Sequence, residues 1–544
     1  FLLVLLLLPI AFAKSGSMRL LAVANTDLGQ RGSVADIYLE IKPGTGRVFI
    51  DSFPLSQVDT QISTRFAKEV ACNFIEADCT KHDFFYTIRS TSGLVGGPSA
   101  GAATAVLTVA VLEGLPIDQE ATITGTINTG GLIGPVGGVS LKLDAASKNK
   151  ITKVLVPKHT LSNETNISEN LEVVEVSHLA EAVKEITGKD YTNTGNLELD
   201  KTYIEVMKKL SVDICERATG LIFILDAKNE KYELGQKAIN DTKYYSAASY
   251  CFIASLELRN EFLLQKNLSE NEINKEINKI FSDATALKEE IDKTEINTIT
   301  DLETYMVVSS RIAEAREKLD DSLKSLNESK VDASIFNLAY GIERLNTAKS
   351  WAGFFSTFGK EFKLDKGAIE ESCLKKISEV EERAQYVELY LPGTTESVRD
   401  SAKDARKQYE LGNPELCLYE ASIAKARTDV VLNTIYLDPD SVNEVIEDRL
   451  NIVYSLIAKQ TNKGIFPIVA YSYYEYADSL KKEDQASALL YLEYALELGN
   501  LDIYFEEKKF NLPYIDKTYL IIFLAGLFVG LGLAIFVLKR KIKR

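Results

Sequence analysis

The chain changes character near residue 195, and this change restricts it to two unlike folded regions. Up to residue 190, short β-branched and aromatic segments alternate with helical segments, separated by glycine and proline. Beyond the polar run Thr192-Asn193-Thr194-Gly195-Asn196, glycine becomes sparse. Leu, Ala, Tyr, Lys and Glu then prevail with helical periodicity to about residue 510. The pattern predicts a mixed α+β domain at 14–192 and an all-α domain at 193–515.

Within the first region, each predicted element has a distinct composition. Helices are expected at 56–75, 100–112, 141–147 and 179–186, and Ser56 is a candidate N-cap for the first of them. Strands are expected at 19–23, 34–41, 48–53, 84–88, 121–127, 154–156 and 171–176.

The second region repeats a loose theme in which a helix and a polar break precede an Ala/Tyr-rich helix. The theme resembles tetratricopeptide-type hairpins, but its spacing is irregular and no strict period is present. An α-helical hairpin domain is therefore expected, with a long antiparallel coiled coil around 261–330 as the alternative. The four stretches are 232–258, 319–348, 409–426 and 476–498.

Both ends of the chain are apolar. Residues 1–13 end in Ala11-Phe12-Ala13, which is typical of a signal peptide, here with its basic n-region truncated. An uncleaved anchor is the alternative, but so short a run does not span a bilayer. Residues 519–538 carry no charge and predict one transmembrane helix, and the basic residues 539–544 predict a cytoplasmic tail. We therefore expect a single-pass cell-membrane protein whose bulk is extracellular.

The net charge and the cysteine content restrict which partners and ligands the chain is expected to bind. The net charge of −16 argues against binding to nucleic acid or to anionic lipid surfaces. The chain has six cysteines and no Cys-x-x-Cys pair, so no metal site is expected. Their order suggests disulfides 72–79, 215–251 and 373–417, while other connectivities and free thiols remain open.

Ser99 and Lys142 are the candidate catalytic pair. Ser99 lies in the turn Gly96-Gly97-Pro98-Ser99-Ala100-Gly101. A serine hydroxyl needs a base to remove its proton, and lysine serves as that base only when it is neutral. Leu141 and Leu143 indicate an apolar setting, and a predicted helix start at Lys142 also disfavours the ammonium. A Ser/Lys hydrolytic dyad is therefore expected.

Several further landmarks accompany this pair in a fixed order, and together they resemble the proteolytic domain of Lon proteases over about residues 19–189. The landmarks are Pro-Ser-Ala-Gly at 98–101, Thr124-Gly125, Pro-Val-Gly-Gly at 135–138, Lys142, Ala145-Ala146 and Val-Leu-Val-Pro at 154–157.

The resemblance implies the Lon-type fold, polypeptide substrates and assembly of identical chains into a ring. It places Thr124 beside Lys142, and a backbone N–H of Gly97, Ser99 or Ala100 would bind the oxyanion. The sequence departs from many family members at Val95-Gly96, where they carry Lys-Asp, and at Thr126, where they carry an acidic residue.

Other chemistries find little support. Residues 97–101 match Gly-x-Ser-x-Gly literally, but His82, His159 and His178 lie in no motif, so a Ser/His site is the weaker alternative. The sequence contains neither His-Glu-x-x-His nor the phosphate-binding Gly-x-x-x-x-Gly-Lys-Ser/Thr, so neither a metal nor another cofactor is expected.

Together these features favour a membrane-anchored, ATP-independent serine endopeptidase acting on exported or unfolded proteins. The architecture resembles that of archaeal membrane-anchored Lon-like proteins without an ATPase module. The alternative is an inactive Lon-like surface scaffold that binds partners through its helical domain, and a weaker alternative is a domain that cleaves its own chain once.

Overall fold

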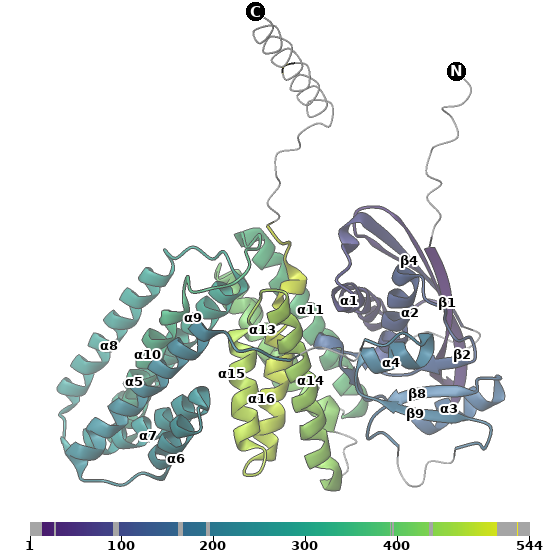
Figure 1. Cartoon of the computed structure of the whole chain (residues 1–544). Helices are drawn as coiled ribbons and strands as arrows, with labels where there is room; N and C mark the ends of the chain where they lie inside the picture. Colours follow the sequence, from purple (N-terminus) through teal and green to yellow (C-terminus); the bar gives the residue numbers. More distant parts are fainter. Residues whose placement is uncertain are drawn as a thin grey trace, which may run out of the picture. The chain divides into compact units, whose positions relative to one another are not determined.

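The computed structural model describes residues 14–26, 29–90, 97–161, 167–191, 196–391, 393, 396–434, 439–508 and 530 (Figure 1). The chain divides into a large compact unit that ends at Glu506 and a second unit at 507–544. Because the second unit is described only at its start and at Gly530, the fold below is that of the first.

A four-stranded sheet opens the chain. Its strands are β1 (Lys14–Thr26), β2 (Gly29–Pro43), β4 (His82–Ser90) and β3 (Val48–Phe53), in the order β1-β2-β4-β3. The pairs β1/β2 and β2/β4 are antiparallel, and β3 runs parallel to β4 after the crossover helix α1 (Val58–Phe74). Alternation along β2 buries Ile37, Leu39 and Ile41 on one face and exposes Tyr38 on the other.

A second, parallel sheet consists of β5 (Ala121–Ile123), β8 (Lys153–Pro157) and β9 (Glu172–Val176). Between β5 and β8 the chain forms the short hairpin of β6 (Thr126–Ile127) and β7 (Ile133–Gly134), followed by helix α3 (Val139–Lys148). Helix α4 (Leu179–Thr187) closes the region. Single 3₁₀ turns lie at 79–81, 98–100 and 129–131.

Helix α2 (Gly101–Glu113) is the core element of this region. Every residue from 101 to 112 is buried, and the helix packs against β1, β2, α1 and α4. Its small alanine and threonine side chains allow the neighbouring elements to approach closely on all sides. A helix that has no polar face is typical of a buried core position.

Two expectations for this region are wrong in detail. The predicted strand 121–127 is broken at Thr124-Gly125 into β5 and β6. The first helix is preceded by Gln57, which makes no side-chain cap, rather than by Ser56. The Ser56 N–H donates to Ser52 Oγ at 3.0 Å, so Ser56 belongs to the turn that leaves β3.

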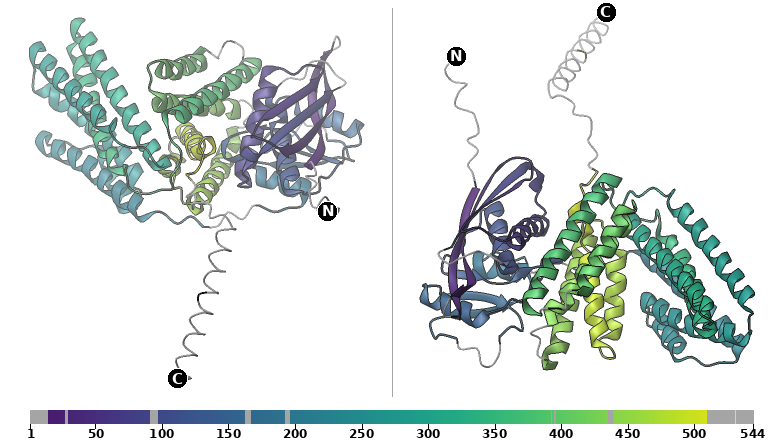
Figure 2. Two further views of the ribbon diagram at one scale, coloured as in Figure 1. Left: turned by 90° about the horizontal axis from the view of Figure 1, so that it is seen from above. Right: turned by 180° about the vertical axis from the view of Figure 1, so that it is seen from behind.

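The second region is helical, as predicted (Figures 1 and 2). Each of the four stretches with the repeated theme includes parts of two consecutive helices and the turn that joins them. Helix α9 packs on both α8 and α10, and more extensively on α10. The helices are α5 (Lys201–Leu225), α6 (Glu230–Asn240), α7 (Tyr244–Gln265), α8 (Glu270–Ile291), α9 (Ile299–Asn327), α10 (Val331–Trp351), α11 (Lys366–Tyr390), α12 (Glu396–Glu410), α13 (Pro414–Thr434), α14 (Val442–Asn462), α15 (Ile468–Leu480) and α16 (Gln485–Leu498). Short 3₁₀ turns lie at 352–354, 439–441 and 501–504.

All six cysteines are paired, in the order that the sequence suggests: Cys72–Cys79, Cys215–Cys251 and Cys373–Cys417. Helix α1 ends at Phe74, which lets the chain turn back so that Cys79 reaches Cys72. The other two disulfides join α5 to α7 and α11 to α13.

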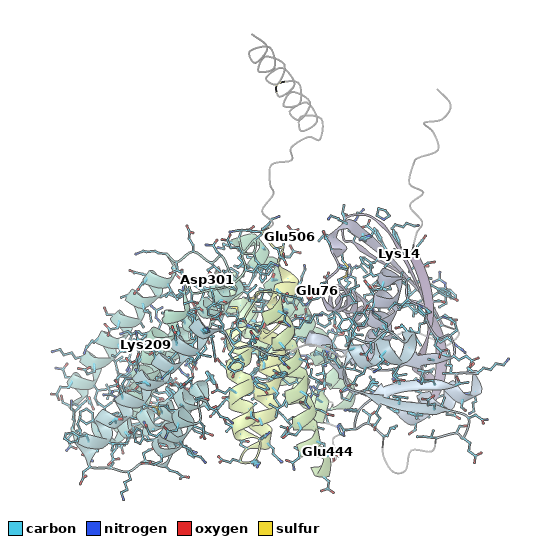
Figure 3. All side chains as sticks on the ribbon, viewed as in Figure 1. Lys14, Glu76, Lys209, Asp301, Glu444 and Glu506 are labelled. Atoms are coloured by element: carbon cyan, nitrogen blue, oxygen red, sulfur yellow. A yellow bond between two sulfur atoms is a disulfide. The ribbon has the colours of Figure 1, made fainter. Side chains whose placement is uncertain are left out.

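Charged side chains project from the outer surfaces of the helices, for example Lys209 on α5 and Glu444 on α14 (Figure 3). Within the described part of the chain, no helix combines the length and the apolar composition needed to cross a bilayer. The predicted signal peptide at 1–13 and the tail at 539–544 lie outside the described residues, as does the transmembrane run at 519–538 apart from Gly530.

Candidate active site

Ser99 lies in the 3₁₀ turn at 98–100, directly before α2, and its side chain is half-buried. Gly97 precedes this turn with φ 89° and ψ 149°, a backbone conformation that only glycine adopts without strain. The next residue, Ala100, accepts a hydrogen bond from Thr104 Oγ1 at 2.9 Å through its carbonyl oxygen. The serine is thus presented at the start of a buried helix.

Lys142 lies in the second turn of α3, and its side chain is 3% exposed. Burial lowers the pKa of Lys142 from 10.5 to about 7. Lys142 Nζ donates a hydrogen bond to Thr124 Oγ1 at 3.0 Å. The apolar setting expected for this lysine is present, because its neighbour Leu143 is buried in the core that α3 shares with β8. At pH 7 a large fraction of this amine is therefore neutral.

Thr124 and Gly125, where the predicted strand is broken, contact both predicted catalytic residues, Lys142 and Ser99. The Gly125 N–H donates to Ser99 O at 3.0 Å, and the Ala102 N–H donates to Gly125 O at 3.1 Å. Thr124 in turn contacts Lys142, so three sequence-predicted residues meet at one point of the fold. In the described part of the chain, no hydrogen bond joins Ser99 to Lys142. Catalytic hydrogen bonds are often long or absent without substrate.

The histidines have other surroundings. His178 caps the N-terminus of α4 and its ring contacts Gly130 O at 2.7 Å, while burial lowers its pKa. His159 contacts Asp448 of α14 at 3.4 Å, and His82 begins β4 opposite Pro43. The described hydrogen bonds of these rings do not reach Ser99. Of the two family departures, Val95-Gly96 lies outside the described residues, and Thr126 is buried in β6 opposite Gly134.

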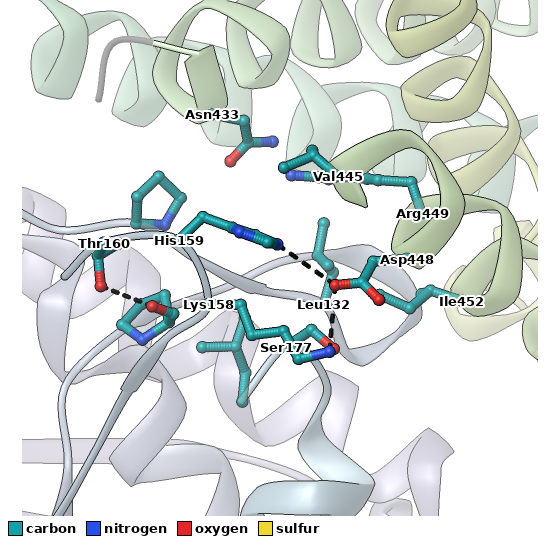
Figure 4. Close-up of a pocket in the computed structure, with 13 residues that line it drawn as sticks. Leu132, Lys158, His159, Thr160, Ser177, Asn433, Val445, Asp448, Arg449 and Ile452 are labelled. Carbon is teal, nitrogen blue, oxygen red and sulfur yellow. Dashed lines mark hydrogen bonds and ion pairs between the residues drawn. The ribbon is translucent and has the colours of Figure 1, made fainter. Parts of the chain in front are cut away.

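A small pocket, open to solvent, lies between the C-terminal end of β8 and helix α14 (Figure 4). Lys158 Nζ and His159 Nε2 contact Asp448 Oδ2 there, at 3.1 and 3.4 Å. Neither Ser99 nor Lys142 lines it. Within the described residues, no cluster of His, Cys, Asp and Glu could hold a metal ion.

Two contacts near Ser99 could not be predicted from the sequence. Ser63 Oγ of α1 donates to Pro98 O at 3.5 Å, and Arg383 Nη2 of α11 donates to Ile127 O at 2.9 Å. Neither residue lies in a motif. No periodicity links residue 383 to residue 127, so no signal in a single sequence could have found this contact.

Comparison with known proteins agrees with the geometry. Residues 68–189 match the family model of the Lon protease (S16) C-terminal proteolytic domain. The chain is 31% identical over 169 residues to the Lon protease of Rhizobium meliloti (strain 1021), which is 30% of this chain and 21% of that protein. It is 32% identical over 99 residues to the archaeal Lon protease of Halobacterium salinarum, covering 18% of this chain and 14% of that protein. With the archaeal Lon protease of Archaeoglobus fulgidus it shares 33% identity over 112 residues, which is 20% of this chain and 18% of that protein. The chain thus spans about a fifth of the length of the curated relatives it matches.

Proposed function

Since residues 68–189 form a Lon-type proteolytic domain, of the serine-peptidase class, we propose that this chain is an endopeptidase in which Ser99 is the nucleophile and Lys142 the general base. The observation that carries the proposal is the buried Lys142 amine, which lies against Thr124 while Gly125 is bonded to Ser99. Such a constellation of perturbed base and adjacent nucleophile is typical of a hydrolytic site.

The proposed reaction has two stages. Ser99 Oγ attacks the scissile carbonyl carbon and passes its proton to neutral Lys142 Nζ. The tetrahedral intermediate then expels the amine, which takes the proton from Lys142, and an acyl-enzyme ester remains. Water hydrolyses this ester by the same proton path in reverse. A neutral amine that donates one hydrogen to Thr124 Oγ1 keeps its lone pair available for Ser99.

The helix start beside the serine supplies the oxyanion donors in this proposal. Backbone N–H groups at the start of a helix lack intrahelical acceptors and can bind an oxyanion. The Gly101 and Ala102 N–H groups already donate to Pro98 O and Gly125 O, so the donors are sought before them. Gly97, Ser99 and Ala100 are the candidate donors, because Pro98 has no N–H.

The proposal extends to the setting of the enzyme. The apolar run 1–13, the uncharged run 519–538 and the basic tail favour an extracellular domain anchored in the cell membrane. The absence of a phosphate-binding loop in these 544 residues favours cleavage of unfolded or exported polypeptides without ATP. The family resemblance favours a homo-oligomeric ring.

The test is to label the purified chain with a fluorophosphonate probe and to measure cleavage of unfolded casein with and without ATP. Ser99→Ala and Lys142→Ala should abolish both signals. Lys148→Ala is the matched control, because Lys148 lies on the same helix but is exposed and paired with Asp144. Casein cleavage that requires ATP would contradict the ATP-independent part of the proposal.

An inactive scaffold is the alternative function, and the missing Ser99–Lys142 hydrogen bond is the observation that favours it. Wild-type protein that neither takes up the probe nor cleaves casein would support the scaffold. Cleavage lost in Ser99→Ala would exclude it.

A further inference from the structure

The segment 124–128 contacts the proposed catalytic residues at one end and the helical region at the other. At its first end, Thr124 contacts Lys142 and Gly125 contacts Ser99. At its second end, Arg383 Nη2 donates to Ile127 O at 2.9 Å and also to Asn128 Oδ1. Arg383 comes from α11, in the helical region. One side chain from that region is therefore bonded to the segment that holds Ser99.

Arg383 is itself held firmly. It is 3% exposed, and its Nε pairs with Asp429 Oδ1 of α13 at 3.2 Å. The guanidinium thus uses different nitrogens for the helical region and for β6, in the rigid fork geometry that arginine provides. A shift of Arg383 away from Asp429 would leave a buried carboxylate short of a partner, which is costly.

Behind Asp429 lies a buried ionic cluster that spans α11, α13 and α16. Lys425 Nζ contacts Asp429 Oδ2 at 3.4 Å and pairs with Glu497. Lys376 Nζ contacts the same Glu497 at 3.0 Å. The side chains of Lys376, Lys425 and Glu497 are at most 1% exposed. Each member depends on the others for its charge balance, so the cluster is a rigid base for Arg383.

Tight packing links the segment to the turn that contains Ser99. A Cβ atom on Gly101 would come within 3.1 Å of Ile127 N and within 3.0 Å of Ser63 Oγ. The backbone of Ile127, whose carbonyl Arg383 holds, therefore lies directly against the start of α2. Helix α1 provides a second connection between the ionic cluster and the serine turn. Lys425 Nζ lies 5.3 Å from the ring centre of Phe66, which is one helical turn from Ser63.

We propose that Arg383 is a positioning residue for the Ser99 turn, and that the helical region thereby completes the proteolytic site. In this proposal Arg383 fixes the position of the Ile127 carbonyl. Ile127 and Gly125 then fix the start of α2. As a result, the Ser99 hydroxyl keeps its position relative to Lys142. The inference rests on the proposed function for its catalytic consequence, but its structural part is independent of that function.

The experiment compares full-length wild-type protein with Arg383→Gln, Arg383→Lys and Arg259→Gln. Arg383→Gln should lower kcat for casein peptides and the rate of probe uptake by about 10- to 100-fold, with KM changed by less than about threefold. Arg383→Lys should recover part of the loss, because lysine can still donate to Ile127 O but lacks the fork. Hydrogen exchange in the segments 97–102 and 124–128 should be faster in Arg383→Gln than in wild type.

Arg259→Gln is the matched control. Arg259 also pairs with a buried carboxylate, Glu343 at 2.9 Å, but it lies in α7, away from the serine turn. It should leave kcat and exchange at 97–102 unchanged. If Arg383→Gln fails to fold, Asn128→Ala replaces it, because this variant removes an acceptor of Arg383 and keeps the pair with Asp429.

A folded Arg383→Gln or Asn128→Ala protein with wild-type kcat and wild-type exchange at 97–102 would overturn the inference. If the wild type itself shows no probe uptake and no cleavage, the proposed function fails. The exchange measurement still decides in that case whether Arg383 holds the turn.

Discussion

At the scale of single residues, the pKa of Lys142 sets the expected pH dependence of the reaction. Burial lowers this pKa to about 7, and a general base works only in its neutral form. We expect kcat/KM to rise tenfold per pH unit well below pH 7 and to level off above about pH 8. Steady-state kinetics between pH 5 and 9 would check this. A rate that is flat from pH 5 to 8 would contradict the role of Lys142 as base.

The same pKa predicts that Lys142 is costly for stability. Its folded pKa, about 7, lies below the ordinary value of 10.5, so between these values the unfolded chain binds more protons than the folded one. Stability contributed through this residue therefore rises with pH across that window. Lys142→Met should stabilise the protein at pH 7 by roughly 2–4 kcal/mol, despite the lost hydrogen bond to Thr124.

Scanning calorimetry of wild type and Lys142→Met at pH 7 and at pH 10 would check this expectation. The difference in Tm should be largest at pH 7 and should shrink toward pH 10. An equal Tm at pH 7 would show that the amine is not buried in the folded state.

The residues of the site could be predicted where a local pattern carries them. Ser99 and Lys142 stand beside glycine turns and apolar neighbours, and these patterns predict a turn and a buried amine. Arg383 could not be predicted. A lone arginine on a polar helix is usually solvated, and only the tertiary fold brings it to Ile127.

At the scale of elements, helix α2 depends on Gly101 for its approach to β6. Gly101 has ordinary helical dihedral angles, so the constraint is spatial: an added Cβ would meet Ile127 N and Ser63 Oγ at 3.0–3.1 Å. Gly101→Ala should push α2 away from β6 and misalign Ser99. We expect a loss in kcat of about tenfold or more and a destabilisation of about 1–3 kcal/mol.

Casein cleavage and the Tm of Gly101→Ala would measure both effects. Gly114→Ala is an informative comparison at the other end of α2, where an added Cβ meets nothing within 4 Å but the left-handed φ of 68° is strained. Gly114→Ala should lower Tm and leave kcat unchanged. The reverse result, with kcat lowered only by Gly114→Ala, would contradict the packing argument.

The elements themselves follow from the sequence to the extent that their periodicity is local. The strands at 34–41 and 48–53 were predictable because β-branched and aromatic residues lie there between turn signals. The break at Thr124-Gly125 was not, because a single glycine within a run of threonine and isoleucine is also compatible with one continuous strand. The backbone leaves the strand there to bond Ser99 and Ala102, and these partners lie outside the segment.

At the scale of the whole molecule, disulfides clamp the helical region. Cys215 and Cys251 close a loop with a sequence separation of 36 between α5 and α7. Replacing both with alanine should destabilise the region by about 3–4 kcal/mol, mainly because the unfolded chain gains freedom. The Tm should fall, while the probe reactivity of Ser99 should persist at 25 °C, because the main contacts of its turn are with α1, α2, β1 and β6.

A Tm equal to that of wild type would show that this disulfide adds no stability. Loss of probe reactivity in a protein that is still folded would show that α5 and α7 influence the serine at a distance.

The division into two regions and the order of the disulfides could be predicted from composition and cysteine spacing. The contact of Arg383 with Ile127 could not be predicted, and neither could the buried ion pairs of the helical region. Lys376, Lys425 and Glu379 lie on helices whose charged residues suggest a solvated face, yet their side chains are buried. Pairing between distant helices offsets part of the cost of burying such charges, and a single sequence does not reveal which charges pair.

The buried ionic cluster also bears on how the molecule responds to heat. The free energy of hydrating a charged group becomes less favourable as temperature rises, so the cost of burying these ion pairs falls. Stabilisation by apolar packing does not grow in the same way. The junction around Arg383 and Asp429 should therefore outlast its neighbours on warming. The serine turn would keep its alignment at temperatures where the outer hairpins, such as α6 with α7, begin to open.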